Sequence, residues 1–373
     1  MNEFTLPIRN LLGQPTRSAL TTLGVAVAVA GLIALTGLTQ GLQNSYDRGI
    51  EETGADFIVS QRDAFSIFSS SVPASLGSIL PKVDGVEAVS GTLLNFTSID
   101  NDANIVIAGW PIGSYLWRNL RLLDGQIPEV TDPPGVVLGE SIARALKKHV
   151  GDDVELQFKQ HKIVGIASFG TSLNQNIAIV LLPSLQELLG RVGTVTLYQV
   201  KLARPLDAKR VASVGARLIS AADGFAVNNT AEFVSNIRFF HIIQEFASAI
   251  SIIVFGMALL AVANTLLMAV NERTYELGIL GAIGWSPARI IRLILLESIM
   301  MSAIGGAVGV GLGIVAMNFV AKTNIAAGVL EPYVTLSIVT QALIAVMLIG
   351  PLGAFYPAWR AIRLKPAEAL RAH

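Results

Sequence analysis

Residues Asn271–Glu297 read NERTYELGILGAIGWSPARIIRLILLE and lie between two long apolar segments. Within this stretch Ser286 and Pro287 form a helix-start signature, because a serine side chain accepts hydrogen bonds from free backbone amides and proline fits the first helical position. Neither a soluble loop nor a plain linker between membrane spans needs this construction. The stretch therefore predicts a short charged helix against the membrane, a glycine corner at Gly284, and a new helix that enters the membrane.

The composition indicates a membrane protein that also carries a globular part. The chain has 373 residues, of which 52% are hydrophobic and 14% charged. The apolar residues concentrate near 19–42 and within 246–363, whereas 43–235 has a mixed composition. A formal net charge of zero gives no support to a nucleic-acid partner. The absence of cysteine excludes disulfides and thiolate metal sites, and the four histidines are scattered without ligand spacing.

Four segments are long and apolar enough to cross a membrane, which takes about 20 residues. The first could instead be a signal peptide, but its apolar run exceeds the usual core of roughly 7–15 residues, and we expect an uncleaved anchor. We predict the following division: cytoplasmic N-terminus and first span at 1–42, extracytoplasmic domain at 43–245, second span at 246–270, cytoplasmic coupling-helix region at 271–289, third span at 290–320, short outer loop at 321–333, fourth span at 334–356, and cytoplasmic tail at 357–373.

The basic residues predict how these spans are oriented. Loops rich in lysine and arginine stay in the cytoplasm. Both termini and the 271–292 loop are predicted to be cytoplasmic, and the 43–245 domain is predicted to face outward. The residues that carry this prediction are Arg9, Arg17, Arg273, Arg289, Arg292, Arg360, Arg363, Lys365 and Arg371.

The region between the first two spans shows short alternating runs typical of strands, with helical patterns between them. Strands are predicted at 56–60, 105–109, 154–158 and 162–166, and helices at 141–149 and 208–220. The predicted fold class is therefore an α-helical membrane protein with four transmembrane helices plus one large extracytoplasmic α+β domain between helices 1 and 2. At 230–245 an amphipathic stalk helix is predicted to run unbroken into the second span, either as a transmitter of movement or as a packed connector.

Four parts of the chain resemble the MacB/LolC/FtsX group of ABC permeases. The stretch 272–297 resembles the group's signature, YPAWRAIRLKPAEALR at 356–371 resembles its C-terminal tail, and 9–41 and 136–165 resemble its N-terminal and outer-domain patterns. A basic pair commonly follows Gly-Ile in the group, whereas Leu280 and Gly281 stand there in this chain. Residues that fall on the signature are Glu272, Arg273, Thr274, Glu276, Gly278, Ile279, Ala282, Gly284 and Glu297.

The resemblance implies a permease that works beside an ATP-binding subunit. This chain has no G-x-x-x-x-G-K-[ST] phosphate loop, so we expect ATP and Mg²⁺ to be bound by a separate ATPase, and we expect neither a cofactor nor enzyme activity in this chain. Two permease copies would pair with two ATPases in the membrane lipid, and a periplasmic adaptor or a cell-wall component is a further possible partner. The predicted coupling helix would contact the ATPase through Glu272, Arg273, Glu276, Leu277, Gly278, Ile279, Ala282 and Gly284.

Glycines in the third span predict close helix packing. Gly305, Gly309 and Gly313 recur every fourth residue, a spacing at which helix backbones approach closely. The seam they form lies either within one chain or between two permease copies. Polar residues inside the spans are few, chiefly Asn264, which we expect to hold helices together, and Glu297. This argues against a polar conduit and favours mechanotransmission, in which helix movement acts on a substrate outside the membrane.

Three functions fit these patterns. The first is export of a drug, peptide, lipid or haem-like molecule. The second is release of lipoproteins from the membrane, and the third is an FtsX-like relay that activates an external cell-wall hydrolase. The polar loops at 63–76 and 168–178 are candidates for recognition, or they are solvent-facing turns.

Overall fold

The computed structural model describes residues 13, 15–100, 103–321 and 333–363. Its contacts divide the chain into two compact units. One, called here the helical unit, holds described residues up to Gln40, 244–321 and 333–363. The other, the sheet unit, holds Gly41–Ile243.

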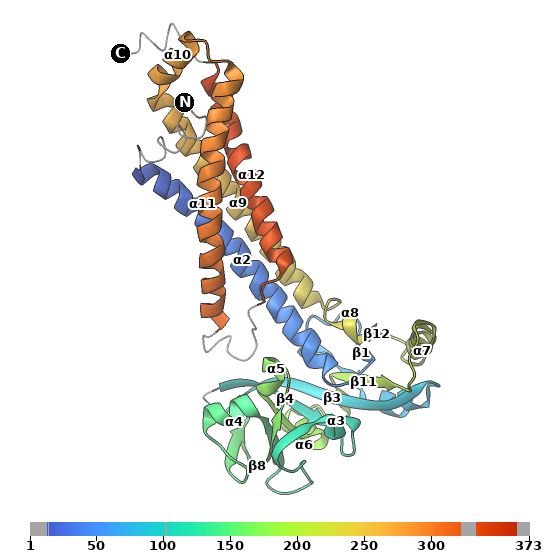
Figure 1. Cartoon of the computed structure of the whole chain (residues 1–373). Coiled ribbons are helices and arrows are strands. Elements are labelled where there is room, and N and C mark those ends of the chain that lie inside the picture. The colour runs from blue at the N-terminus through green and yellow to red at the C-terminus, as the bar shows by residue number, and fades with distance from the viewer. Residues whose placement is uncertain (1–12, 14, 101–102, 322–332, 364–373) are drawn as a thin grey trace. The chain divides into compact units, whose positions relative to one another are not determined.

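The helical unit is built from four long helices and one short one (Figure 1). The long helices are α2 (Pro15–Glu51), α9 (Arg238–Glu272), α11 (Pro287–Ala321) and α12 (Leu336–Ala361), and the short one is α10 (Thr274–Ala282). By length and composition, each long helix in the described chain could cross a membrane. Helix α2 continues to Glu51, so its last turns belong to the sheet unit, as do the first residues of α9.

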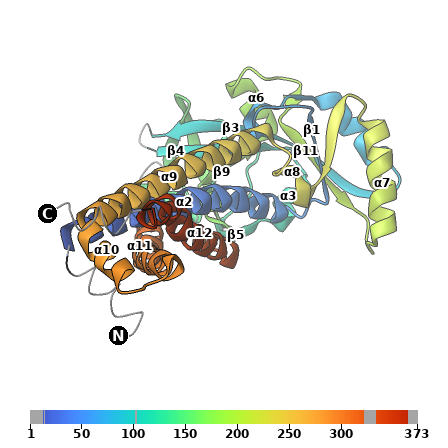
Figure 2. The ribbon, with the colours of Figure 1, turned by 90° about the horizontal axis from the view of Figure 1, so that it is seen from above.

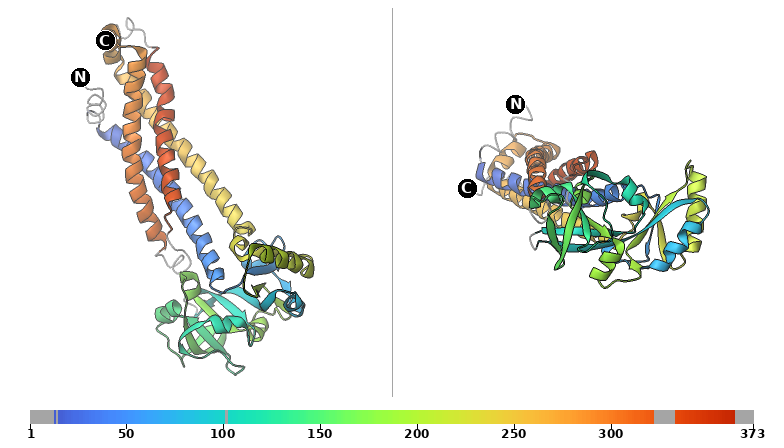
Figure 3. Two further views of the ribbon diagram at one scale, coloured as in Figure 1. Left: turned by 45° about the vertical axis from the view of Figure 1, so that its right-hand side comes forward. Right: turned by 90° about the horizontal axis from the view of Figure 1, so that it is seen from below.

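Glycines allow the long helices to approach one another closely. Helices α11 and α12 run side by side (Figures 1 and 3), and a Cβ atom added at Gly306 would lie 2.4 Å from a methyl group of Val346. The glycine seam of α11 faces α2 of the same chain, so the structure supports the first of the two alternatives for it. Added Cβ atoms at Gly305, Gly309 and Gly313 would lie 2.7, 2.6 and 3.0 Å from the carbonyl oxygens of Thr22, Ala26 and Ala30. Asn264, expected between helices, is instead exposed.

The described strands of the sheet unit form one large mixed sheet and one small ribbon. The order in the large sheet is β12-β1-β11-β3-β4-β9-β6-β8-β5, with β7 paired to β3 and β8, and β10 pairs with β2. Pairs β4/β9 and β6/β8 are parallel and the others antiparallel. The bounds are β1 Phe57–Gln61, β2 Val72–Pro73, β3 Val86–Ile99, β4 Ala103–Trp110, β5 Arg121–Gly125, β6 Gly135–Gly139, β7 Asp153–Leu156, β8 Lys159–Ser168, β9 Ile177–Leu181, β10 Thr194–Val195, β11 Leu197–Leu202 and β12 Phe225–Asn229.

Short helices cover the sheet. They are α3 (Tyr115–Asn119), α4 (Glu140–Leu146), α5 (Ser172–Gln175), α6 (Leu182–Leu188), α7 (Ala208–Ala221) and α8 (Thr230–Phe233). The longest of them is α7, which lies beside β12 (Figure 3). The carboxylate of Asp207 accepts a hydrogen bond from the backbone amide of Arg210 at 2.6 Å and so caps its start. Val214 and Leu218 bury its apolar face in the core with Phe57.

Three elements predicted between the first two spans differ in the structure. The helix predicted at 141–149 ends at Leu146, because Lys147 adopts a left-handed conformation with φ 54°. The strand predicted at 154–158 ends at Leu156, because Gln157 and Phe158 adopt positive φ angles of 49° and 64° and form the turn into β8. The single helix predicted at 230–245 is divided: α8 ends at Phe233 and α9 begins at Arg238. In place of a helical bond, the backbone amide of Phe239 donates to the carbonyl oxygen of Phe65 at 2.9 Å, so a non-local contact replaces the local helix.

Candidate functional site at the junction of helices 9, 10 and 11

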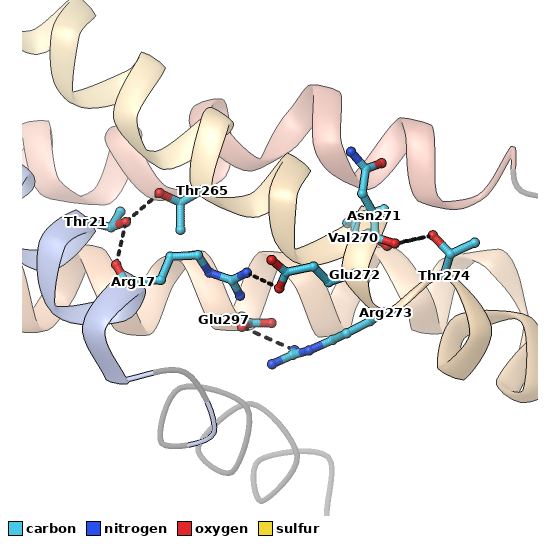
Figure 4. Close-up of polar contacts among 9 residues, drawn as sticks. All are labelled: Arg17, Thr21, Thr265, Val270, Asn271, Glu272, Arg273, Thr274 and Glu297. Carbon is cyan, nitrogen blue, oxygen red and sulfur yellow. Dashed lines mark hydrogen bonds and ion pairs between the residues drawn. The ribbon is translucent and has the colours of Figure 1, made fainter. Parts of the chain in front are cut away.

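The predicted coupling segment is a helix junction. Helix α9 ends at Glu272, Arg273 has φ −101° and ψ 18°, and α10 begins at Thr274. The Thr274 hydroxyl donates toward the carbonyl oxygens of Val270 at 3.1 Å and Asn271 at 2.8 Å (Figure 4). It thereby satisfies carbonyl groups that the end of α9 leaves without helical partners. The stretch 271–284, predicted as one short helix, is therefore split between the end of α9 and α10.

Two ion pairs connect this junction to other helices of the unit (Figure 4). Arg17 of α2 contacts Glu272 at 2.8 Å between Nη1 and Oε2. On the other side, Arg273 contacts Glu297 of α11 at 3.5 Å between Nη1 and Oε1. The end of α9 is thus bonded both to the start of α2 and to α11.

The two ion pairs differ in burial and therefore in their expected contribution to stability. In the Arg273–Glu297 pair the side chains are 17% and 7% exposed. A carboxylate so far from water needs its cationic partner, and removal of one member of a buried pair costs several kcal/mol. In the other pair the Glu272 side chain is 39% exposed, and pairs this open to water contribute about 0–1 kcal/mol. The Arg273–Glu297 pair is therefore the stronger connection.

Helix α10 has one buried face and one accessible face. Leu277 and Gly278 are buried, and Leu277 packs in the helical core with Ile290 and Ile294 of α11. Figures 1 and 2 show α10 beside the first turns of α11. Of the residues predicted to contact an ATPase, Glu276 and Ala282 are exposed and Ile279 is half-buried, whereas Leu277 and Gly278 face inward.

Sequence reasoning missed two large apolar side chains on this surface. Tyr275 is 42% exposed and Ile283 is 73% exposed. The helical period could have identified Tyr275, because it places Tyr275, Ile279 and Ala282 on one side of α10 and Leu277 on another. Tyr275, Glu276, Ala282 and Ile283 are called here the α10 surface.

The corner after α10 has the predicted glycine. Gly284 has φ +98°, a conformation that favours glycine, and the amide of Trp285 donates to the carbonyl oxygen of Leu280 at 3.0 Å. A bond of this span around a left-handed glycine is the Schellman ending of a helix. Helix α11 then begins at Pro287, as the Ser286-Pro287 signature predicted.

A cavity of about 90 Å³ joins the α10 surface to the buried ion pair. Arg273, Glu276 and Glu297 border it, together with aliphatic side chains of α9, α10 and α11. A partner that displaced Glu276 would therefore change the surroundings of the Arg273–Glu297 pair. Across the described residues, no group of three or more His, Cys, Asp or Glu side chains is placed to hold a metal ion.

In the sheet unit, the two loops predicted for recognition border one cavity. Its volume is about 320 Å³, and its lining includes Ile67 and Phe68 from the first loop and Phe169 and Asn174 from the second. The sequence indicated the loops by their composition, but it gave no sign that α2, α3 and the strands β3, β4, β5 and β11 also contribute to the walls.

Comparison with known proteins decides the family. The model of the MacB-like periplasmic core domain matches residues 18–225, and the model of the FtsX-like permease C-terminal region matches residues 248–366. The chain belongs to the MacB/FtsX family of ABC permeases. The first match contains most of α2 and most of the sheet unit, and the second contains the α9–α10–α11 junction.

Individual relatives are distant but extend over nearly the whole chain. It is 27% identical to the macrolide export ATP-binding/permease protein MacB of Nitrobacter winogradskyi over 95% of this chain and 58% of that protein. With the pyoverdine export ATP-binding/permease protein PvdT of Pseudomonas fluorescens it shares 25% identity, over 95% of this chain and 57% of that one. The chain thus spans less than two thirds of these relatives. An ABC transporter permease of Methanocaldococcus jannaschii is 24% identical, over 99% of this chain and 97% of that protein.

Two solved structures are similar to about half of this chain. The extracellular domain of the ABC-type transporter YknZ aligns with 47% of this chain and 100% of that one, at 17% identity and a TM-score of 0.36. The periplasmic region of MacB from Actinobacillus actinomycetemcomitans aligns with 50% of this chain and 95% of that one, at 14% identity and a TM-score of 0.37.

Proposed function

We propose that this chain is the membrane-spanning permease of an ABC exporter, in which a separate ATPase subunit binds the α10 surface and drives the helices by mechanotransmission. The observation that carries this proposal is the junction itself. An exposed short helix adjoins a buried ion pair that connects α9 to α11, and a second pair connects α9 to α2. This construction suits the transfer of force from a bound partner to three membrane helices.

The proposed sequence of events begins at the ATPase, which holds ATP and Mg²⁺. Its closure displaces α10, which cannot slide freely because Leu277 is packed in the helical core. The displacement passes through Arg273 and Glu297 to α11 and, more weakly, through Glu272 and Arg17 to α2. The sheet unit, which includes the last turns of α2 and the first residues of α9, then changes position and acts on the substrate.

The assembly we propose contains two permeases and two ATPases in the cytoplasmic membrane, with the sheet unit on the outer side. The glycine seam is already used by α2, so contacts with the second copy would use other surfaces. Large apolar side chains on α9, such as Ile252, Ile253 and Leu260, are exposed in the single chain and would meet lipid or the second copy. The names of the relatives support export, and the proposed substrate is a drug, peptide, lipid or haem-like molecule.

Copurification tests whether α10 receives the ATPase. The tagged permease is expressed with its native genomic neighbours, as wild type, as Glu276→Lys and as Glu129→Lys, and any ATP-binding subunit that copurifies is quantified. Glu129 is an exposed residue of the sheet unit and supplies the matched charge reversal. We expect Glu276→Lys to reduce recovery of the ATPase about tenfold or more, because a central interface residue can contribute ~2 kcal/mol, and Glu129→Lys to leave it unchanged. Equal recovery with all three proteins would refute α10 as the docking site.

The same complex tests the transmission step. Glu297→Gln removes the negative charge that Arg273 contacts but leaves the α10 surface intact. We expect the ATPase to copurify normally and its permease-dependent rate of ATP hydrolysis to fall several-fold. An unchanged rate of ATP hydrolysis would show that the Arg273–Glu297 pair does not transmit movement between α10 and α11.

A further inference from the structure

The sheet unit contains a ligand-sized cavity at the end of α2. Its volume of about 320 Å³ lies at the lower end of the roughly 300–1,000 Å³ that small-molecule pockets occupy. Aromatic and aliphatic side chains form most of the wall, among them Phe68, Leu94, Trp110 and Phe169. Such walls favour an apolar body over a hydrated one, since burial of apolar surface is the main gain on binding.

A buried amide on the cavity wall has an open hydrogen-bonding position. Gln199 of β11 is only 6% exposed, and its Oε1 accepts a hydrogen bond from Thr92 Oγ1 at 2.8 Å. No acceptor within the described part of the chain lies in hydrogen-bond reach of Gln199 Nε2. Because Gln199 borders the cavity, this N–H group can donate a hydrogen bond to an oxygen of whatever enters it.

Two charged side chains border the cavity, and they differ in whether they have hydrogen-bond partners within the chain. Glu52 is engaged, because its Oε2 accepts hydrogen bonds from Asn174 Nδ2 at 2.7 Å and Thr171 Oγ1 at 3.3 Å. Arg121 of β5 also borders the cavity, and its side chain is exposed. Its guanidinium has no carboxylate or carbonyl partner among the residues that the structure describes. The cavity therefore holds one carboxylate, whose Oε2 is hydrogen-bonded, and one guanidinium that has no partner among the described residues.

We propose that this cavity binds a small apolar carboxylic acid. Its carboxylate pairs with Arg121 at the exposed end, because guanidinium and carboxylate match in charge and in hydrogen-bond geometry. Its apolar body lies between Phe68, Trp110 and Phe169, and the Gln199 amide selects a ligand with an oxygen acceptor. The proposal does not depend on the direction of transport or on the α10 surface, since all of its residues lie in the sheet unit.

Tryptophan fluorescence of the full chain in lipid nanodiscs tests this proposal. The Trp285→Phe/Trp359→Phe variant leaves only Trp110 and Trp117, both in the sheet unit, and Trp110 borders the cavity. The probes are octanoate, octanol and octylammonium, which share an alkyl chain and differ in charge. We expect a saturable change with octanoate, weaker binding of octanol, and about tenfold or greater discrimination against octylammonium.

Matched arginine variants locate the carboxylate. In the same background, Arg121→Gln should weaken octanoate binding about tenfold and leave octanol binding unchanged. Arg118→Gln supplies the control, because Arg118 is an exposed neighbour that does not border the cavity. Octanoate binding that is equal in the two variants would overturn the role of Arg121. Absence of any saturable signal, or tighter binding of octylammonium than of octanoate, would overturn the proposal as a whole.

Discussion

The helical unit and the sheet unit fill their cores by different means. In the helical unit, glycines bring backbones together, as where a Cβ atom at Gly309 would lie 2.6 Å from the carbonyl oxygen of Ala26. In the sheet unit, fully buried aliphatic side chains such as Leu138 and Ile179 occupy the interior. Helices in lipid gain no hydrophobic energy from meeting, so they rely on close contact, whereas a domain in water is stabilised by the burial of large apolar side chains.

Their buried polar groups differ as well. Glu297 in the helical unit is paired with Arg273, because an ionised group in an apolar environment needs a partner. In the sheet unit, Gln199 keeps one amide group open toward a cavity. The paired charge in the helical unit is what the proposed transmission requires, and the open amide group in the sheet unit is what the proposed ligand site requires.

The largest effect is expected from a truncation in the sheet core. Leu138 of β6 is 0% exposed, and Leu138→Ala should lower the free energy of unfolding by about 2–5 kcal/mol through lost burial and the resulting cavity. Denaturant unfolding followed by the fluorescence of Trp110 and Trp117 measures it. Ile112→Ala is the control, because Ile112 is 65% exposed. Equal losses of unfolding free energy in the two variants would contradict the view that buried large side chains stabilise this core.

A smaller effect is expected from enlargement in the helical seam. Gly309→Leu should separate α11 from α2 and lower stability by about 1–3 kcal/mol. Gly311 of the same helix has nothing within 4 Å of an added Cβ atom, so Gly311→Leu should leave the midpoint of thermal unfolding in detergent nearly unchanged. If Gly311→Leu were as destabilising as Gly309→Leu, glycine would matter in α11 for a reason other than close packing.

The smallest effect concerns the one buried histidine of the sheet core. His161 of β8 is 1% exposed, and burial lowers its pKa below the usual value of about 6.5. As the pH falls through the usual histidine pKa, the unfolded chain therefore binds a proton at His161 that the native chain does not bind. The stability that this difference provides is complete above about pH 6.5 and falls, by at most about 1.4 kcal/mol per pH unit, as the pH drops below that value.

Unfolding free energies at pH 7.5 and pH 5.5 measure this difference. His161→Gln should reduce the loss of stability on acidification, whereas His149→Gln, at a side chain that is 84% exposed, should not. A pH dependence that is the same in both variants would show that burial of His161 does not control the acid response of the sheet unit.

Much of the organisation was predictable from the sequence, because it depends on local patterns. Continuous apolar runs predicted four helices of spanning length, and Gly284 with Pro287 predicted the corner between α10 and α11. The helix at 208–220 was predicted from its period and is observed as α7. The predictions at 154–158 and 230–245 were wrong in detail, because a turn with positive φ angles and a non-local backbone bond from Phe239 to Phe65 replaced the local pattern.

The sequence by itself determined the number of helices of spanning length, the family and the corner between α10 and α11, since hydrophobic period, turn residues and motifs are properties of neighbouring positions. Only the tertiary structure decided which groups meet. It showed that the glycine seam faces α2, that Arg273 pairs with Glu297, and that two distant loops share a cavity with Gln199. These contacts join residues far apart in the chain, and the periodicity of one segment carries no information about the segment on which it packs.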